Sequence, residues 1–134
     1  MLKFYWLEQT YYDHPNMYSL VLYTGGCNLK CYGCHNRQLA WWMYRNADKT
    51  EKQEIKISET NQALTVDEVK LAVGNEMLDM IILCGWETLI HPMDQIKDTI
   101  NWIKEINPKA LIRIDTNGTF PDKVRELTQW WKVD

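Results

Sequence analysis

Three closely spaced cysteines are the residues of this chain whose type and spacing best suit metal chemistry. Cys27, Cys31 and Cys34 follow the pattern Cys-x3-Cys-x2-Cys, and they come shortly after an apolar run at residues 20–23. A loop at the end of a buried strand can bring three thiolates together, and thiolates are the ligands of iron–sulfur clusters. A cluster of four irons needs four ligands to cover them all. Three cysteines would therefore leave one iron open to a substrate or cofactor.

A zinc site is the main alternative for these cysteines, with Cys84 or His35 as the fourth ligand. Zinc-binding cysteines usually come as two Cys-x2-Cys pairs, and the sequence has no second pair. A ferredoxin site is also disfavoured, because its run is Cys-x2-Cys-x2-Cys with a further ligand. The spacing favours a cluster with an open iron.

Alternating strand and helix patterns predict the scaffold that positions the cysteines. Strands are expected at residues 3–8, 18–24, 80–84 and 110–114. Helices are expected to begin at the capping box Thr65 to Glu68, at Pro92 and at Pro121. Strands that alternate with helices form βαβ units, which predicts an α/β fold with a parallel sheet and right-handed crossovers.

Polar clusters follow two of these strands, just as the cysteines follow another. Residues 85–88 come after the strand at 80–84, and residues 115–118 come after the strand at 110–114. The carboxyl ends of parallel strands meet at one edge of the sheet, which we call the carboxyl edge. Ligand sites of such sheets form there, so we expect the three clusters to build one site.

Composition limits the classes of function. The net charge of −3 argues against binding to nucleic acid or to an anionic membrane, and no apolar run is long enough to span a bilayer. The N-terminus lacks a secretion signal, so we expect a cytoplasmic protein whose thiols stay reduced and bind metal. A length of 134 residues predicts a single domain, residues 1–134.

Taken together, these motifs resemble the radical S-adenosylmethionine (SAM) enzymes. In that superfamily a Cys-x3-Cys-x2-Cys loop after the first strand holds a [4Fe-4S] cluster, and the open iron chelates SAM. One electron from the cluster cleaves SAM to methionine and a 5′-deoxyadenosyl radical, which abstracts a hydrogen atom. The resemblance implies that Cys27, Cys31 and Cys34 are the cluster ligands. It also implies a short partial (βα) barrel of three or four parallel strands, spanning the single domain.

The resemblance further implies which residues bind SAM. Residues 84–89 are similar to the family's Gly-Gly-Glu-Pro segment, which holds the amino group of SAM, and a carboxylate accepts a charge-assisted bond from an ammonium. The expected SAM contacts are Asn36, Gly85, Trp86, Glu87, Thr88, Asp115 and Asn117. No side chain is assigned a catalytic role of its own.

Within the superfamily, the chain is similar to activating enzymes of glycyl-radical enzymes. Cys34-His35-Asn36 resembles the continuation in the pyruvate formate-lyase activating enzyme. Asp115-Thr116-Asn117-Gly118 resembles a turn in anaerobic ribonucleotide reductase activating proteins. The implied partners are a large glycyl-radical enzyme, with anaerobic ribonucleotide reductase expected, and an electron donor such as flavodoxin or ferredoxin. The open side of the short barrel is then expected to dock the partner.

Two other functions remain open from the sequence. A small-molecule radical SAM enzyme resembling 7-carboxy-7-deazaguanine synthase would share the cluster and the fold, although Cys34-His35-Asn36 weighs against it. A non-catalytic metal-binding remnant would keep the cysteines and lack the chemistry.

Overall fold

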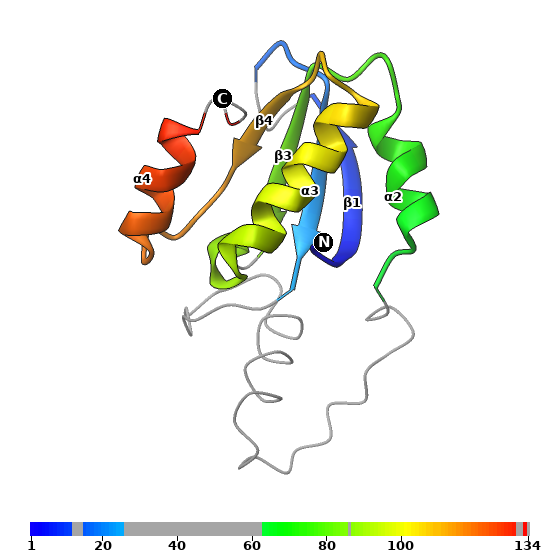
Figure 1. The fold of residues 1–134 in the computed structure, drawn as a ribbon. Helices are drawn as coiled ribbons and strands as arrows, with labels where there is room; N and C mark the ends of the chain where they lie inside the picture. The colour runs from blue at the N-terminus through cyan, green and yellow to red at the C-terminus, as the bar shows by residue number, and fades with distance from the viewer. Residues whose placement is uncertain (12–14, 26–62, 86, 131–132, 134) are drawn as a thin grey trace, which may run out of the picture.

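The computed structural model describes residues 1–11, 15–25, 63–85, 87–130 and 133, which include a four-stranded sheet (Figure 1). The strands lie in the order β1 (Phe4–Thr10), β2 (Ser19–Thr24), β3 (Met80–Gly85) and β4 (Leu111–Ile114). β2, β3 and β4 are parallel, whereas β1 pairs with β2 in the antiparallel sense. The predicted α/β fold with a parallel sheet is confirmed, and it is consistent with a partial barrel.

Among the described residues, three α-helices and one 3-10 helix connect or follow these strands. They are α2 (Val66–Val73), η2 (Thr88–Ile90), α3 (Met93–Ile106) and α4 (Pro121–Gln129). Figure 1 shows α3 lying across the sheet between α2 and α4. The predicted helix starts are confirmed, since Thr65 and Glu68 form the expected capping box and Pro121 is the first residue of α4.

Alternating residues of the strands build a core on the helix-bearing face. Leu20 and Leu22 of β2 lie beside Ile81 and Leu83 of β3 in this core, together with Ile112 of β4. The helices contribute buried side chains to the same core: Val69, Val73, Ile96, Ile100, Ile103 and Leu127. Burial of this apolar surface is the main term that holds the strands in register.

The opposite face of the sheet carries a smaller apolar cluster. Val21, Met80 and Ile82 are buried there, with Tyr23 and Cys84 packed beside them. β2 and β3 are therefore buried on both faces, which explains why their sequences are continuous apolar runs rather than alternating ones. In the part of the chain that the structure describes, no helix is long and apolar enough to cross a membrane.

Candidate functional site

The residues that follow the parallel strands come together at the carboxyl edge of the sheet. Thr24 at the end of β2 is level with Gly85 at the end of β3, and Leu83 is level with Ile114 at the end of β4. The segment after β3 and the turn after β4 are in direct contact through hydrogen bonds. The predicted convergence of these two polar clusters at one edge is confirmed.

Glu87 is the central polar residue of this edge. Its side chain is fully buried, with 0% exposure. Its Oε1 accepts from the amide of Leu89 at 3.0 Å and from the hydroxyl of Thr116 at 2.7 Å, and its Oε2 accepts from the amide of Asn117 at 2.6 Å. Hydrogen bonds to the ionised group offset the cost of removing a carboxylate from water. Glu87 thereby ties the segment after β3 to the turn after β4.

Asp115 and Asn117 also make contacts within the chain. The guanidinium of Arg113 forms a bidentate ion pair with the carboxylate of Asp115. Nε donates to Oδ1 at 2.7 Å, and Nη2 donates to Oδ2 at 2.9 Å. Asn117 is exposed, and its Oδ1 accepts from the amide of Thr119 at 3.0 Å and from the hydroxyl of the same residue at 2.7 Å. The turn is ordered by these bonds, and Asn117 is exposed at the carboxyl edge.

The ion pair of Arg113 was not predicted from the sequence, although the spacing between Arg113 and Asp115 indicates it. Residues two apart in a strand point to the same face, so a cation in a strand can reach a carboxylate two positions on. Arg113 and Asp115 have that spacing. The same rule could have predicted this ion pair.

Gly85 is required by a close approach between two strands. Its φ is +123°, and a Cβ added there would lie 2.4 Å from the carbonyl oxygen of Thr24. The hydroxyl of Thr24 donates to the carbonyl of Cys84 at 3.1 Å, and that of Thr88 donates to the same carbonyl at 3.3 Å. Gly85 and Thr88 therefore lie at the predicted site, and each has a structural role in joining the ends of β2 and β3.

His91 is a second residue whose contact the sequence did not predict. It directly follows η2, and its Nε2 lies 3.0 Å from the carbonyl oxygen of Gly25, the residue after β2. Burial lowers the pKa of the His91 imidazole below its usual value. The hydrogen bond to Gly25 opposes this effect, and the charge of Lys123 adds to it. Its partner lies 66 positions away in the chain, so no local pattern points to the contact.

The remaining predicted site residues lie outside the described residues. They are Cys27, Cys31, Cys34, Asn36 and Trp86. Among the residues that are described, no three His, Cys, Asp or Glu side chains are grouped so as to hold a metal ion. Cys84 lies at the end of β3, and its side chain is half-buried. The predicted cluster ligands thus stay a prediction from the sequence.

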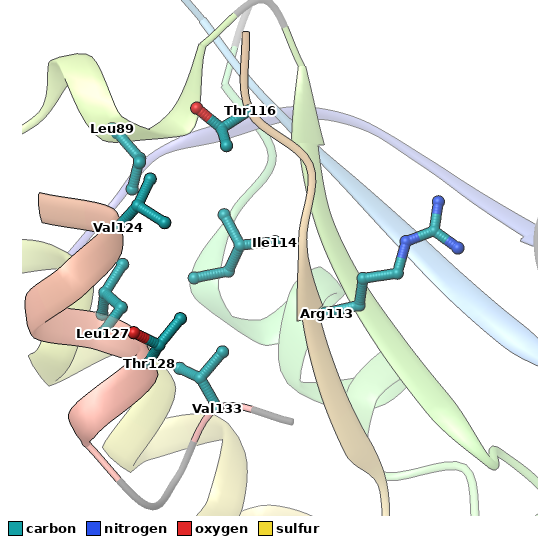
Figure 2. Close-up of a pocket in the computed structure, with 8 residues that line it drawn as sticks. All are labelled: Leu89, Arg113, Ile114, Thr116, Val124, Leu127, Thr128 and Val133. Atoms are coloured by element: carbon teal, nitrogen blue, oxygen red, sulfur yellow. The ribbon is translucent and has the colours of Figure 1, made fainter. Parts of the chain in front are cut away.

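A pocket of about 190 Å³ lies beside the carboxyl edge, between β4 and α4 (Figure 2). It is lined by Leu89, Arg113, Ile114, Thr116, Val124, Leu127, Thr128 and Val133. Figure 2 shows aliphatic side chains from both elements facing one another, whereas the guanidinium of Arg113 points away to the other side of β4. A lining of this kind offers little to a zwitterionic ligand. Polar groups lie instead at the edge itself, around Glu87 and Asn117.

Comparison with known proteins gives a consistent picture. The model of the family described as the radical SAM superfamily matches residues 21–131. A protein of Methanocaldococcus jannaschii, provisionally named a glycyl-radical enzyme activating enzyme, is 28% identical over 123 residues. That alignment covers 91% of this chain and 42% of the relative, so the chain spans less than half of the relative's length. No solved structure matches significantly.

Proposed function

This chain belongs to the radical SAM superfamily, and we propose that it cleaves SAM reductively to install a glycyl radical on a partner enzyme. The observation that carries the proposal is the carboxyl edge. There the carbonyl of Gly25, which leads toward the cysteines, lies within hydrogen-bonding distance of the segment after β3. That segment is in turn bonded to the turn after β4 through Glu87. The two segments assigned to SAM are therefore in contact with each other, and His91, after the first of them, contacts Gly25, two residues before Cys27 in the sequence.

We propose Cys27, Cys31 and Cys34 as the ligands of a [4Fe-4S] cluster. Three thiolates directly after a strand fit such a cluster, because thiolate is its usual ligand and three ligands leave one iron open. When bound and reduced, the cluster supplies the electron that breaks a carbon–sulfur bond of SAM. The chain's own residues must then hold the sulfonium in place and exclude water from the radical.

The residues proposed to hold SAM divide by position. We assign the methionine part to the segment after β3, with Gly85, Trp86, Glu87 and Thr88, and the rest of SAM to Asn36, Asp115 and Asn117. Among the described residues, Oε2 of Glu87 accepts from the amide of Asn117. Because Glu87 is fully buried, a SAM ammonium group would have to approach Oε2 from the carboxyl edge, where a carboxylate oxygen has capacity for a second donor.

The partner proposal rests on the relative's name and on the resemblance of the motifs. The relative is named for a glycyl-radical enzyme. We propose that the 5′-deoxyadenosyl radical takes a hydrogen atom from a backbone glycine of such an enzyme. The products are 5′-deoxyadenosine and a glycyl radical. We propose an anaerobic ribonucleotide reductase as that partner, a flavodoxin or ferredoxin as the electron donor, and the reducing cytoplasm as the compartment.

The test is anaerobic reconstitution with iron and sulfide, followed by dithionite and SAM. The expected product is 5′-deoxyadenosine, measured by chromatography, with about four irons per chain. Cys31→Ser should abolish product formation, because a proposed cluster ligand is lost. Cys84→Ser is the matched control and should leave both iron content and product unchanged.

Two results would reject the proposal in different ways. One zinc per chain, reduced in the Cys84→Ser variant, would support the zinc-binding alternative. SAM cleavage that increases with a pterin substrate, and leaves no glycyl radical on a reductase by electron paramagnetic resonance, would favour the small-molecule enzyme.

A further inference from the structure

A hydrogen bond between a side chain and the backbone joins the loop after β3 to the end of β2. Nε2 of His91 lies 3.0 Å from the carbonyl oxygen of Gly25. A carbonyl oxygen can only accept, so Nε2 carries the proton and donates. Gly25 is buried, and in the sequence it is followed by Gly26 and Cys27. The bond therefore holds the backbone at Gly25, two residues before the first proposed cluster ligand.

His91 is itself held from several sides. The ammonium of Lys123, on α4, donates to the carbonyl of Leu89 at 2.7 Å and to that of His91 at 2.8 Å. The amide of His91 closes η2 by donating to the carbonyl of Thr88. Pro92, which follows, is the N-cap of α3. The imidazole is thus carried by a backbone segment that η2, α3 and α4 all hold in place.

Glycine explains why such an anchor matters at this position. Gly25 and Gly26 are consecutive in the sequence, and glycine loses more conformational freedom on ordering than any other residue. A metal site whose ligands become ordered on binding must supply that ordering free energy from metal binding. A carbonyl that is already held at Gly25 lowers this cost for one of the two glycines.

We propose that His91 is a positioning residue for the proposed cluster, and that it acts by holding the Gly25 carbonyl at the entry to the cysteines. This proposal rests on the proposed function, because it assumes that Cys27, Cys31 and Cys34 bind iron. His91 is not a ligand in this proposal. It acts through the backbone, as groups that orient metal ligands commonly do.

Two variants of His91 separate the hydrogen bond from the bulk of the side chain. His91→Gln keeps an N–H donor at a similar distance from the backbone, whereas His91→Leu removes the donor and keeps an apolar side chain of moderate size. The measurement is the rate at which a chelator removes iron from the reconstituted protein, followed by the loss of cluster absorbance. We expect loss about 10-fold faster in His91→Leu and close to the wild-type rate in His91→Gln.

Two further variants guard against a general loss of folding. Lys123→Met keeps the imidazole but removes the two bonds to the carbonyls of Leu89 and His91, so iron loss should accelerate here too. Lys97→Met is the matched control, because it breaks the pair with Glu126 that joins α3 to α4. It should leave iron retention unchanged even if the melting temperature falls.

The outcomes are distinct. If the wild type takes up no iron–sulfur cluster, the proposed function fails and this inference fails with it. If the wild type loads a cluster and His91→Leu retains iron equally well, only the inference is wrong. Equal losses in His91→Gln and His91→Leu would also overturn it, because the donor would then be irrelevant.

Discussion

The carboxylate of Glu87 accepts a hydrogen bond from the backbone amide of Asn117 across 2.6 Å, and this bond joins the segments that follow β3 and β4. The two residues are 30 positions apart in the chain. A fully buried carboxylate with partners on both segments sets the distance between them. Glu87 therefore helps to set the geometry of the proposed SAM site.

Replacing Glu87 should therefore destabilise the fold. In Glu87→Gln the side-chain amide offers a single acceptor oxygen to the donors of Leu89, Thr116 and Asn117, so at least one buried donor loses its partner. We expect a loss of about 2 kcal/mol in the free energy of unfolding, measured with urea on the metal-free protein. Glu105→Gln, at an exposed position of α3, is the control. A Glu87→Gln variant as stable as that control would contradict the bracing role.

Gly85 and Gly118 allow steric crowding to be separated from backbone strain. Both have positive φ, at +123° and +80°, but only at Gly85 does an added Cβ meet another atom within 4 Å. Gly85→Ala should cost about 3 kcal/mol or more, because the methyl group collides with Thr24. Gly118→Ala should cost about 1 kcal/mol, from strain alone. Denaturant unfolding of both variants gives the comparison, and equal losses would mean that β2 and β3 separate readily.

The pair of Arg113 and Asp115 should matter more for binding than for stability. The two side chains are 32% and 39% exposed, so solvent screens their attraction, and Asp115→Asn should change stability by less than about 1 kcal/mol. If Asp115 contacts SAM as proposed, the same variant should weaken SAM binding to the reconstituted protein, measured by calorimetry. Asp122→Asn is the control, because Asp122 lies in the exposed pair with Arg125. Unchanged affinity in Asp115→Asn would remove Asp115 from the proposed site.

His91 predicts a dependence of stability on pH. Its pKa in the folded protein is lowered, mainly by burial, so the unfolded chain binds a proton first as the pH falls through about 6.5. The unfolded state then holds more protons, and the contribution of this group to stability falls as the pH drops from 7.5 toward the folded-state pKa. The melting temperature of the metal-free protein should fall less between pH 7.5 and pH 5.5 in His91→Gln than in the wild type. Parallel falls in the two proteins would show that other groups govern the acid sensitivity.

The sequence predicted the features that are encoded locally. The strand expected at residues 18–24 is Ser19–Thr24, and the strand expected at 80–84 is Met80–Gly85, because buried runs have a composition that can be recognised without a partner. The capping box at Thr65 was predictable for the same reason, since both of its residues lie within one helical turn.

Features that depend on distant partners were not predictable in this way. The antiparallel pairing of β1 with β2 is not encoded in the pattern of either strand. The contacts of Glu87 with Asn117 and of His91 with Gly25 join segments that meet only when the sheet has formed. For Glu87, the position at the carboxyl edge was predicted, whereas the identity of its partners required the structure.

The close contact between Gly85 and Thr24 has a consequence for any pair of ligands bound at this edge. Because there is no room for a methyl group between them, the ends of β2 and β3 are expected to shift together. Two ligands that bind beside these strand ends would then be thermodynamically coupled, since a shift that the first ligand induces in one strand end also changes the position of the other. Such coupling is reciprocal, so a factor by which one ligand tightens the other applies equally in both directions.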